Sequence, residues 1–555
     1  MTESKGSTSY VVLVSLVVAL GGFLMGFDSG VIGGVNEPVR EYFALSSVEL
    51  GWVVSCLTLA ATIAMGVAGP LADRFGRKPV LMTTALLFSI SAIGSAIAPS
   101  YTTLVIARFI GGFGVGAALI IAPMYIAEIA PPDKRGRLVS FNQLNIVLGF
   151  SASFFSNYFI NDGAAANAGG EGWMTPESSW RLMLGVETVP AVLYFFLLLL
   201  VPRSPRWLAT QNRDEEALTV LARANGQAVA ATELQGIREN LAKAAGEARA
   251  KLSDLFNSRM GRIMTIGLGL GFFQQITGIN AIFYYAPTIF EMSGASRDSS
   301  LFMAIVVGLV NIAFTVLAMW MIDRAGRRPL LLAGTSLMAI ALFTNTAAFG
   351  GATYEVTAEA PAQLAESIRT GLMKDLSLEM SDEEANQIAT TAAAEAQVAY
   401  ASLQGQIFES QIDFANAIKA AAEPLSERAR DSLVGKIQDL AKGALELNGM
   451  LVLIAICAFI AGFGISLGPV MWAMFSEIFP MHVRGLAISV AGFFNSAISY
   501  LVQQLFPVGM DTVGPAIVFG FFGTLSVAAF LFSMFIIPET KGRTLEELEE
   551  VLVRN

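Results

Sequence analysis

One short basic stretch occurs twice in this chain, as Asp73-Arg74-Phe75-Gly76-Arg77-Lys78-Pro79 and, 250 residues later, as Asp323-Arg324-Ala325-Gly326-Arg327-Arg328-Pro329. Each copy follows the second of six long apolar runs. A second pair of motifs agrees with the first, because Glu128 and Glu477 are each followed seven residues later by an Arg-Gly dipeptide, Arg135-Gly136 and Arg484-Gly485. Self-similarity of this kind indicates a duplicated structural unit. The sequence therefore predicts two related halves.

The composition is that of a membrane protein. Of the 555 residues, 54% are hydrophobic and 14% are charged, whereas soluble domains have roughly 45 to 50% and about 25%. A run of about 20 apolar residues spans a bilayer as a helix. Twelve such runs occur, at 11–34, 49–70, 79–98, 101–122, 138–160, 182–201, 262–290, 299–322, 329–350, 450–472, 483–508 and 513–537. We therefore predict an all-α membrane protein with twelve transmembrane helices in two pseudo-symmetric six-helix bundles.

Positive charges in the short loops set the expected orientation. Lys and Arg are retained on the cytoplasmic side, and most of those in short loops fall on one side of the alternation, which places both termini and the central loop in the cytoplasm. The first apolar run is expected to be retained, because no small-residue cleavage site precedes it. The predicted segments are a cytoplasmic N-terminus at 1–10, a first bundle at 11–202, a cytoplasmic linker of short amphipathic helices at 203–261, helices seven to nine at 262–350, an insert at 351–447, helices ten to twelve at 448–537 and a cytoplasmic tail at 538–555.

The spacing between the repeated motifs locates the insert. Glu128 lies 54 residues after Arg74, but Glu477 lies 153 residues after Arg324, so the second half has gained 99 residues. Residues 351–447 supply them and are rich in alanine, which favours helix. This segment has 16 acidic and 7 basic residues, which accounts for −9 of the chain's net charge of −10. We expect a helical cap on the extracytoplasmic side, and a solvated cap without a ligand is the simplest interpretation of its charge.

Three ionisable residues stand out inside predicted spans: Asp28 in the first, Arg108 in the fourth and Glu187 in the sixth. Each is a functional candidate, because such a residue costs roughly 2.5 to 3.5 kcal/mol on insertion scales. Glycine recurs at every fourth position of the first span, at Gly22, Gly26, Gly30 and Gly34. This stripe predicts close helix packing, with Asp28 on roughly the opposite face and able to pair with Arg108. Such a pair is either a proton-coupling switch or a static ion pair that fixes helix packing.

Amides and phenols are unusually frequent in the seventh span, which contains Gln274-Gln275-Ile276-Thr277-Gly278-Ile279-Asn280-Ala281-Ile282-Phe283-Tyr284-Tyr285. Amides offer both donors and acceptors and so suit a ligand made of hydroxyls, and Asn280 and Tyr284 share one helix face. Other spans add Gln143, Asn145, Asn311 and Asn495. Together these residues favour a polyol site, although for any single amide an interhelical hydrogen bond worth about 0.6 kcal/mol is an alternative.

Two helix breaks are expected beside these amides. Gly278 permits an interruption of the seventh span. The tenth span should be interrupted before Trp472, whose aromatic face suits the apolar face of a sugar, because it contains Gly462, Gly464, Gly468 and Pro469.

Taken together, these motifs are similar to those of the sugar porter family of the major facilitator superfamily. The resemblance rests on the repeated basic stretch, the 274–285 run, residues 128–136, Ser204-Pro205-Arg206-Trp207-Leu208 and Pro538-Glu539-Thr540-Lys541-Gly542-Arg543. It covers nearly all spans but not the insert. It implies alternating access about a central sugar that is contacted by Gln143, Gln274, Gln275, Asn280, Asn311, Trp472 and Asn495.

The same resemblance implies proton coupling by Asp28, Arg108 and Glu187, because family members that only facilitate diffusion carry Asn in place of Asp28 and lack the acid at Glu187. It also implies a cytoplasmic gate of ion pairs that holds the bundles together when the outward side is open, formed by Arg74, Arg77, Glu128, Arg135, Arg324, Arg328, Glu477 and Arg484. Topology determinants in solvated loops are the alternative for these charges. Two residues depart from the family pattern: Arg203 replaces a glutamate, and Ser496 stands where relatives often place a tryptophan near the sugar.

We therefore expect a proton-coupled symporter for a hexose or pentose that works as a monomer in the cell inner membrane, with sugar, proton and lipid bilayer as partners and no nucleic acid. A facilitative sugar uniporter and a non-transporting membrane sugar receptor are the alternatives. An enzyme is not expected, because no nucleophile–base set or phosphate loop occurs among the spans. No cofactor or metal is expected either, since the chain has only Cys56, Cys457 and His482 as soft ligands.

Overall fold

The computed structural model of the chain describes residues 8–131, 134–167, 174–246, 251–256, 260–377, 380–409, 411–480, 483–543 and 547. His482 lies outside these residues. Two compact units are present. We call them the transmembrane unit, which comprises Met1–Thr288, Asp298–Leu342 and Ile456–Asn555, and the insert unit, which comprises Ile289–Arg297 and Phe343–Ala455.

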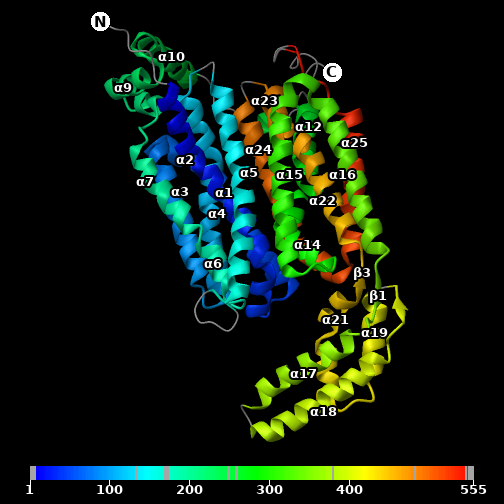
Figure 1. Cartoon of the computed structure of the whole chain (residues 1–555). Helices are drawn as coiled ribbons and strands as arrows, with labels where there is room; N and C mark the ends of the chain where they lie inside the picture. Colours follow the sequence, from blue (N-terminus) through cyan, green and yellow to red (C-terminus); the bar gives the residue numbers. More distant parts are fainter. Residues whose placement is uncertain are drawn as a thin grey trace. The chain divides into compact units, whose positions relative to one another are not determined.

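The first half of the transmembrane unit contains six spans, drawn in blue to cyan-green in Figure 1. Ser46 and Ser100 begin two of the helices by accepting hydrogen bonds from the N–H groups of Glu49 and Thr103, which satisfies free donors of the first turn. The sixth span is interrupted at Glu187. The helices are α1 (Thr8–Tyr42), α2 (Ser47–Phe75), α3 (Arg77–Ala96), α4 (Tyr101–Ile129), α5 (Arg135–Ala166), α6 (Ser179–Gly185) and α7 (Thr188–Leu200).

The glycine stripe of the first span lies directly against α5. A Cβ atom on Gly26 would collide with the carbonyl oxygen of Ile146, and one on Gly34 would collide with the side chain of Asn157. Gly112 on α4 makes the same kind of room for the backbone of α2. Small residues thus bring α1, α2, α4 and α5 close together, as expected for helices that associate in lipid.

After the first half, the described residues of the linker form α8 (Pro205–Thr210), α9 (Asp214–Asn225), α10 (Gln227–Gly246) and α11 (Leu252–Leu255). Helices are thus present between the two halves, although α10, with 20 residues, is longer than the short helices expected there. Trp207, Leu208, Ala217 and Val220 pack into the hydrophobic core of the first half. The apolar face of α9 explains its stability, since a helix this short gains most of its stability from packing.

The second half contains the remaining six spans, and two of them are broken where glycines predicted breaks. The seventh span stops at Gly278, whose φ is +92° and whose missing side chain leaves room for the ring of Phe522. The tenth stops at Ser466. The helices are α12 (Gly261–Ile276), α13 (Ile279–Tyr284), α14 (Ala286–Met292), α15 (Arg297–Ala325), α16 (Arg327–Gly350), α22 (Gly449–Ile465), α23 (Leu467–Ile478), α24 (Arg484–Thr512) and α25 (Pro515–Phe535). Among the described residues, twelve helices are long and apolar enough to cross a membrane, which confirms the twelve predicted spans.

The insert unit has a hydrophobic core of its own around the buried side chains of Tyr400, Phe414, Ile418 and Leu433. Antiparallel α17 and α18 form its long arm (Figure 1). Its elements are β1 (Thr353–Glu355), α17 (Ala360–Leu376), α18 (Asp382–Ala401), β2 (Ile407–Phe408), α19 (Gln411–Ala422), α20 (Glu427–Gly435), α21 (Ile437–Ala444) and β3 (Leu445–Glu446).

The insert is mostly helical, as expected, but it also contains a three-stranded antiparallel sheet in the order β2-β1-β3 that the sequence did not predict. Strands of two or three residues are too short to give the alternating pattern from which a strand is predicted. The sheet brings the two ends of the insert together, since Thr353 lies opposite Glu446 and Tyr354 lies opposite Leu445.

Candidate functional site

Asp28 on α1 and Arg108 on α4 form a buried ion pair. Arg108 Nη1 lies 3.3 Å from Asp28 Oδ1, and the two side chains are 2% and 3% exposed. Arg108 also donates to the carbonyl oxygen of Val53 on α2 at 2.9 Å. The second carboxylate oxygen of Asp28, Oδ2, has no hydrogen-bond partner among the described residues. It lies close to Gly111, where a Cβ atom would approach it to 3.3 Å. One oxygen of a buried carboxylate is therefore free to accept a proton.

Glu187 is the second buried acid of this half. It sits at the break between α6 and α7 and is 3% exposed. Its Oε1 atom has no hydrogen-bond partner among the described residues. Asp28 and Arg108 are both close enough to act on it electrostatically. The three ionisable residues that the sequence singled out thus lie in one region, although they come from three different spans.

Four amides of the second half form a hydrogen-bonded group, which we call the amide cluster: Gln274, Gln275, Asn280 and Asn495. Asn495 on α24 donates to Gln274 Oε1 at 2.7 Å. The Gln275 amide donates to Gln274 Oε1 at 3.0 Å, and Asn280 donates to Gln275 Oε1 at 3.0 Å. The break at Gly278 separates α12 from α13, so residues on either side of it can turn toward the same point.

The other residues predicted to contact a sugar come from four helices: Gln143 from α5, Asn311 from α15, Trp472 from α23 and Tyr284 from α13. Among the described residues, neither Gln143 on α5 nor Asn311 on α15 shares a hydrogen bond with the amide cluster; Gln143 is exposed and Asn311 is buried. Trp472 on α23 is 44% exposed and lies edge-on to Phe475. The buried ring of Tyr284 stacks on Phe150 of α5, with centroids 6.0 Å apart.

Hydrogen bonds join the two halves at the end of the unit opposite the start of α1, which we call the distal end. Arg40 on α1 lies 2.7 Å from Asp511 on α24, and Ser47 on α2 also donates to that carboxylate. Ser55 on α2 donates to Gln504 on α24 at 2.7 Å. Sequence reasoning missed these residues. The available indication was a series of small hydroxyl residues within the otherwise apolar second span.

At the opposite, terminal end, each half has an ion pair of its own. Arg77 at the start of α3 lies 2.9 Å from Glu128 at the end of α4, and Ser204 donates to the same carboxylate. In the second half, Arg327 lies 2.7 Å from Glu477, and Thr540 donates to Glu477. Each ion pair joins two residues of the same half, so in this conformation it stabilises one bundle and does not link the two.

One ion pair involves an arginine outside the predicted gate set. Arg327 pairs with Glu477, while the guanidinium of Arg328 donates to the carbonyl oxygen of Met534. The repeat already indicated that Arg327 would pair with Glu477, since Arg327 occupies the position of Arg77. Three other gate arginines make different contacts: Arg74 lies over the Phe75 ring, Arg324 lies over the Trp320 ring, and Arg484 donates to the carbonyl oxygen of Phe479.

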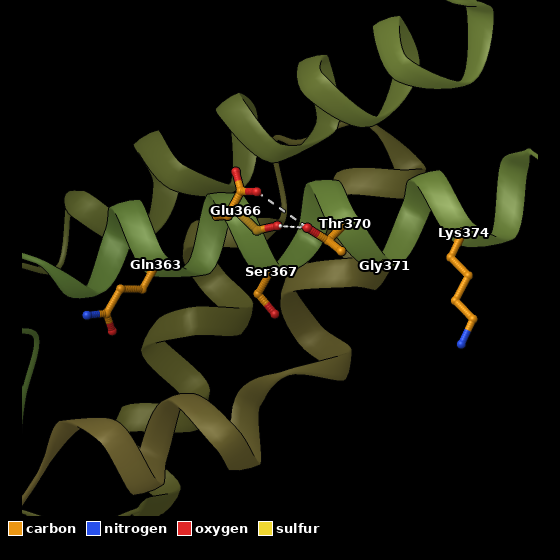
Figure 2. A pocket seen from close by; sticks show the side chains of 6 residues that line it. All are labelled: Gln363, Glu366, Ser367, Thr370, Gly371 and Lys374. Carbon is orange, nitrogen blue, oxygen red and sulfur yellow. Dashed lines mark hydrogen bonds between the residues drawn. The ribbon is translucent and has the colours of Figure 1, made fainter. Parts of the chain in front are cut away.

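A hollow in the insert unit lies along α17 and is lined by Gln363, Glu366, Ser367, Thr370, Gly371 and Lys374 (Figure 2). All six residues belong to one helix, so the hollow has no second wall of its own. The carboxylate in the hollow, that of Glu366, is already paired within α17. It accepts a hydrogen bond from Arg369, which holds the pKa of Glu366 below its ordinary value. The hollow is therefore a feature of the helix surface.

Two duplicated six-helix halves, with discontinuous helices whose breaks meet polar side chains, define a secondary transporter. The chain belongs to the family described as "Sugar (and other) transporter", whose model matches residues 14–363 and 434–552. The protein is thus a membrane transporter of the major facilitator type and not an enzyme. The match omits residues 364–433, which lie within the insert.

Characterised relatives are similar over almost their whole length. The arabinose-proton symporter of Bacillus subtilis is 33% identical over 99% of this chain and 96% of the relative. The D-xylose-proton symporter of Escherichia coli is 31% identical, with the same coverage. A solved structure of the Escherichia coli xylose transporter in an inward-open conformation matches with a TM-score of 0.70 and 30% identity, covering 98% of this chain and 100% of the other.

Proposed function

We propose that this protein is a proton-coupled monosaccharide symporter that works by alternating access. The observation that carries the proposal is the Asp28–Arg108 pair, a buried carboxylate with one free oxygen, in a chain that also contains the amide cluster. Relatives named as proton symporters for arabinose and xylose support it, as does one named a glucose transport protein.

The sugar is proposed to bind at the amide cluster. Gln274, Gln275, Asn280 and Asn495 offer both N–H donors and carbonyl acceptors, and sugar hydroxyls can act as either partner. Gln143, Tyr284, Asn311 and Trp472 are proposed to complete the site. Ser496 follows Asn495 and adds a small polar side chain. The proposed substrate is a hexose or pentose.

The proton is proposed to bind to Asp28. An ionised Asp28 attracts Arg108, and protonation of the carboxylate removes that attraction and frees the guanidinium to move. Glu187 is proposed as the second acid of the same relay, since its Oε1 atom is also available. Movement of Arg108 would change how α4 holds α1 and α2, because it bonds to residues of both.

The orientation is proposed from the loop charges, with both termini cytoplasmic, the insert extracytoplasmic and the protein a monomer in the cell inner membrane. On this assignment the distal end faces outward. The Arg40–Asp511 and Ser55–Gln504 contacts then close the outward side, which makes this an inward-facing conformation. The gate arginines and glutamates of the terminal end are proposed to meet across the halves when the transporter faces outward.

The test replaces Asp28 with asparagine and compares it with Glu41→Gln, an exposed acid on the same helix. Proteoliposomes are assayed for sugar counterflow and for uptake driven by a proton gradient, with D-xylose, arabinose and glucose as the panel. Asp28→Asn should abolish gradient-driven uptake and keep counterflow, whereas Glu41→Gln should keep both. Loss of both activities in correctly folded Asp28→Asn protein contradicts the coupling role.

Facilitated diffusion is the second candidate, because the Asp28–Arg108 pair is so deeply buried that it can also serve as a static link between helices. Wild-type uptake that ignores both the proton gradient and a protonophore would establish this alternative.

A further inference from the structure

Helix α24 carries a buried polar stripe that continues beyond the amide cluster. Asn495, Ser499 and Gln503 follow one another at intervals of four residues, which places them on one helix face. They are 5%, 3% and 0% exposed. Only Asn495 belongs to the amide cluster. Burying a polar side chain costs free energy unless the side chain is hydrogen-bonded. The hydrogen-bond partners of Ser499 and Gln503 therefore indicate the role of these two residues.

These partners form one continuous chain of hydrogen bonds. Asn280 of the amide cluster donates to the Ser499 hydroxyl at 2.7 Å. The Gln503 amide donates to the same hydroxyl at 2.8 Å. The Gln503 carbonyl in turn accepts from the hydroxyl of Thr58 at 2.8 Å. Thr58 lies on α2, so the last bond of the chain crosses from the second half to the first.

The chain ends beside the contacts that close the distal end. Ser55 lies one turn from Thr58 on α2 and bonds to Gln504, the neighbour of Gln503 on α24. The Gln503 backbone is held as well, because Tyr285 at the end of α13 donates to its carbonyl oxygen at 3.4 Å. Movement of Gln503 is therefore tied both to the helix that carries Asn280 and to the interface between α2 and α24.

We propose that Ser499, Gln503 and Thr58 are positioning residues that transmit sugar occupancy of the amide cluster to the contacts that close the distal end. A sugar hydroxyl that accepts from Asn280 competes with Ser499 for the same N–H group. Without that bond the Ser499 hydroxyl is free to rotate, and its hold on the Gln503 amide weakens. The Thr58–Gln503 bond then breaks more readily, and α2 can separate from α24. The inference rests on the proposed binding of sugar at the amide cluster.

Thr58→Val tests the proposal, since it removes the hydroxyl and keeps the shape of the side chain. Thr62→Val is the matched control on the same helix, because the Thr62 hydroxyl donates only within α2, to the carbonyl oxygen of Thr58. Thr58→Ser keeps the donor and should behave like wild type. Ser499→Ala breaks the chain from the α24 side and guards against a local effect at residue 58.

The measurement is the distance between spin labels on cysteines at Glu41 of α1 and Thr512 of α24, in full-length protein whose Cys56 and Cys457 are replaced by alanine. In wild type, saturating sugar from the panel of D-xylose, arabinose and glucose should increase the long-distance, distally open population. Thr58→Val and Ser499→Ala should raise this population about fivefold without sugar, as expected for loss of one neutral hydrogen bond. Added sugar should then change it little.

Equal distance distributions for Thr58→Val and Thr62→Val, with and without sugar, would overturn the proposal. So would a Thr58→Ser protein that opens as much as Thr58→Val, because the hydroxyl would then not be responsible. A wild-type protein that shows neither counterflow nor a sugar-dependent distance contradicts the proposed function itself. A wild type that responds to sugar while Thr58→Val matches the control contradicts only the role of the chain.

Discussion

The two copies of the basic motif form the same kind of ion pair, but the helix that follows each copy is supported differently at its start. In both copies an arginine at the start of a helix pairs with a glutamate, and a hydroxyl residue, Ser204 or Thr540, donates to that glutamate. The residue before the hydroxyl is Arg203 in the first half and Glu539 in the second. Glu539 accepts hydrogen bonds from the N–H groups of Arg327 and Arg328, each at 3.1 Å, whereas Arg203 lies over the ring of Trp207.

This difference shows how one residue changes the support of a helix terminus. Glu539 satisfies free N–H groups at the start of α16 and places a negative charge at the positive end of the helix dipole. In the first half, Arg203 cannot accept these bonds, and α3 begins at Gly76 without a side-chain cap. The Trp207 ring lies beside Gly76 instead, where Glu539 lies beside Gly326. The first half therefore relies more heavily on its buried ion pair.

The largest predicted loss of stability comes from removing the negative charge of Glu128. Glu128→Gln leaves Arg77 without its main partner in a site where both side chains are less than a tenth exposed, and breaking such a pair costs about 3 kcal/mol or more. Glu477→Gln should cost about half as much, because Glu477 is 21% exposed. Thermal unfolding of the purified variants in detergent measures the difference. Equal losses of stability would show that burial does not distinguish the two ion pairs.

The next effect concerns the helix cap. Glu539→Gln should lower the free energy of unfolding by about 1 kcal/mol, because the neutral amide accepts more weakly from Arg327 and Arg328 and loses the interaction with the helix dipole. Arg203→Ala should cost less, about 0.5 kcal/mol, as expected for an exposed cation–π contact. A larger loss in Arg203→Ala than in Glu539→Gln, measured by the same unfolding assay, contradicts the assigned roles.

A smaller effect, with the opposite sign, is predicted for Arg203→Glu. This substitution gives the first half the residue found in the second, and it should stabilise the start of α3 by about 0.5 kcal/mol through the helix dipole. The matched control is Arg203→Gln, which removes the positive charge without adding a negative one. If the two variants have the same melting temperature, the cap at α16 does not transfer to α3.

The smallest effect is expected from the insert, which interrupts only the second half. The pairing of Thr353 with Glu446 brings its two ends together, so a short Gly-Ser linker can replace residues 355–445. Sugar counterflow should persist, and Glu477→Gln should cost the same stability as in the full chain. Complete loss of transport in stably inserted protein would show that the insert contributes to transport itself.

Much of the fold followed from local features of the chain. Lipid requires every backbone polar group to be bonded within a helix, so twelve apolar runs sufficed to predict twelve spans. Gly278 and the 462–469 segment predicted the two breaks, because backbone freedom is a property of the residue itself. The insert was located by the spacing of the repeats, although its short strands were not foreseen. Arg327 was not among the predicted gate residues, although it occupies the position of Arg77 in the repeat and pairs with Glu477.

The sequence by itself determined which residues are costly in a membrane and where helices begin, end and break, since these depend on residues close together in the chain. Only the tertiary structure decided which of those residues meet. The Asp28–Arg108 pair, the bonds within the amide cluster and the link from Ser499 through Gln503 to Thr58 each depend on how one helix is rotated and shifted against another. That rotation is set by packing between helices distant in sequence, which no single segment encodes.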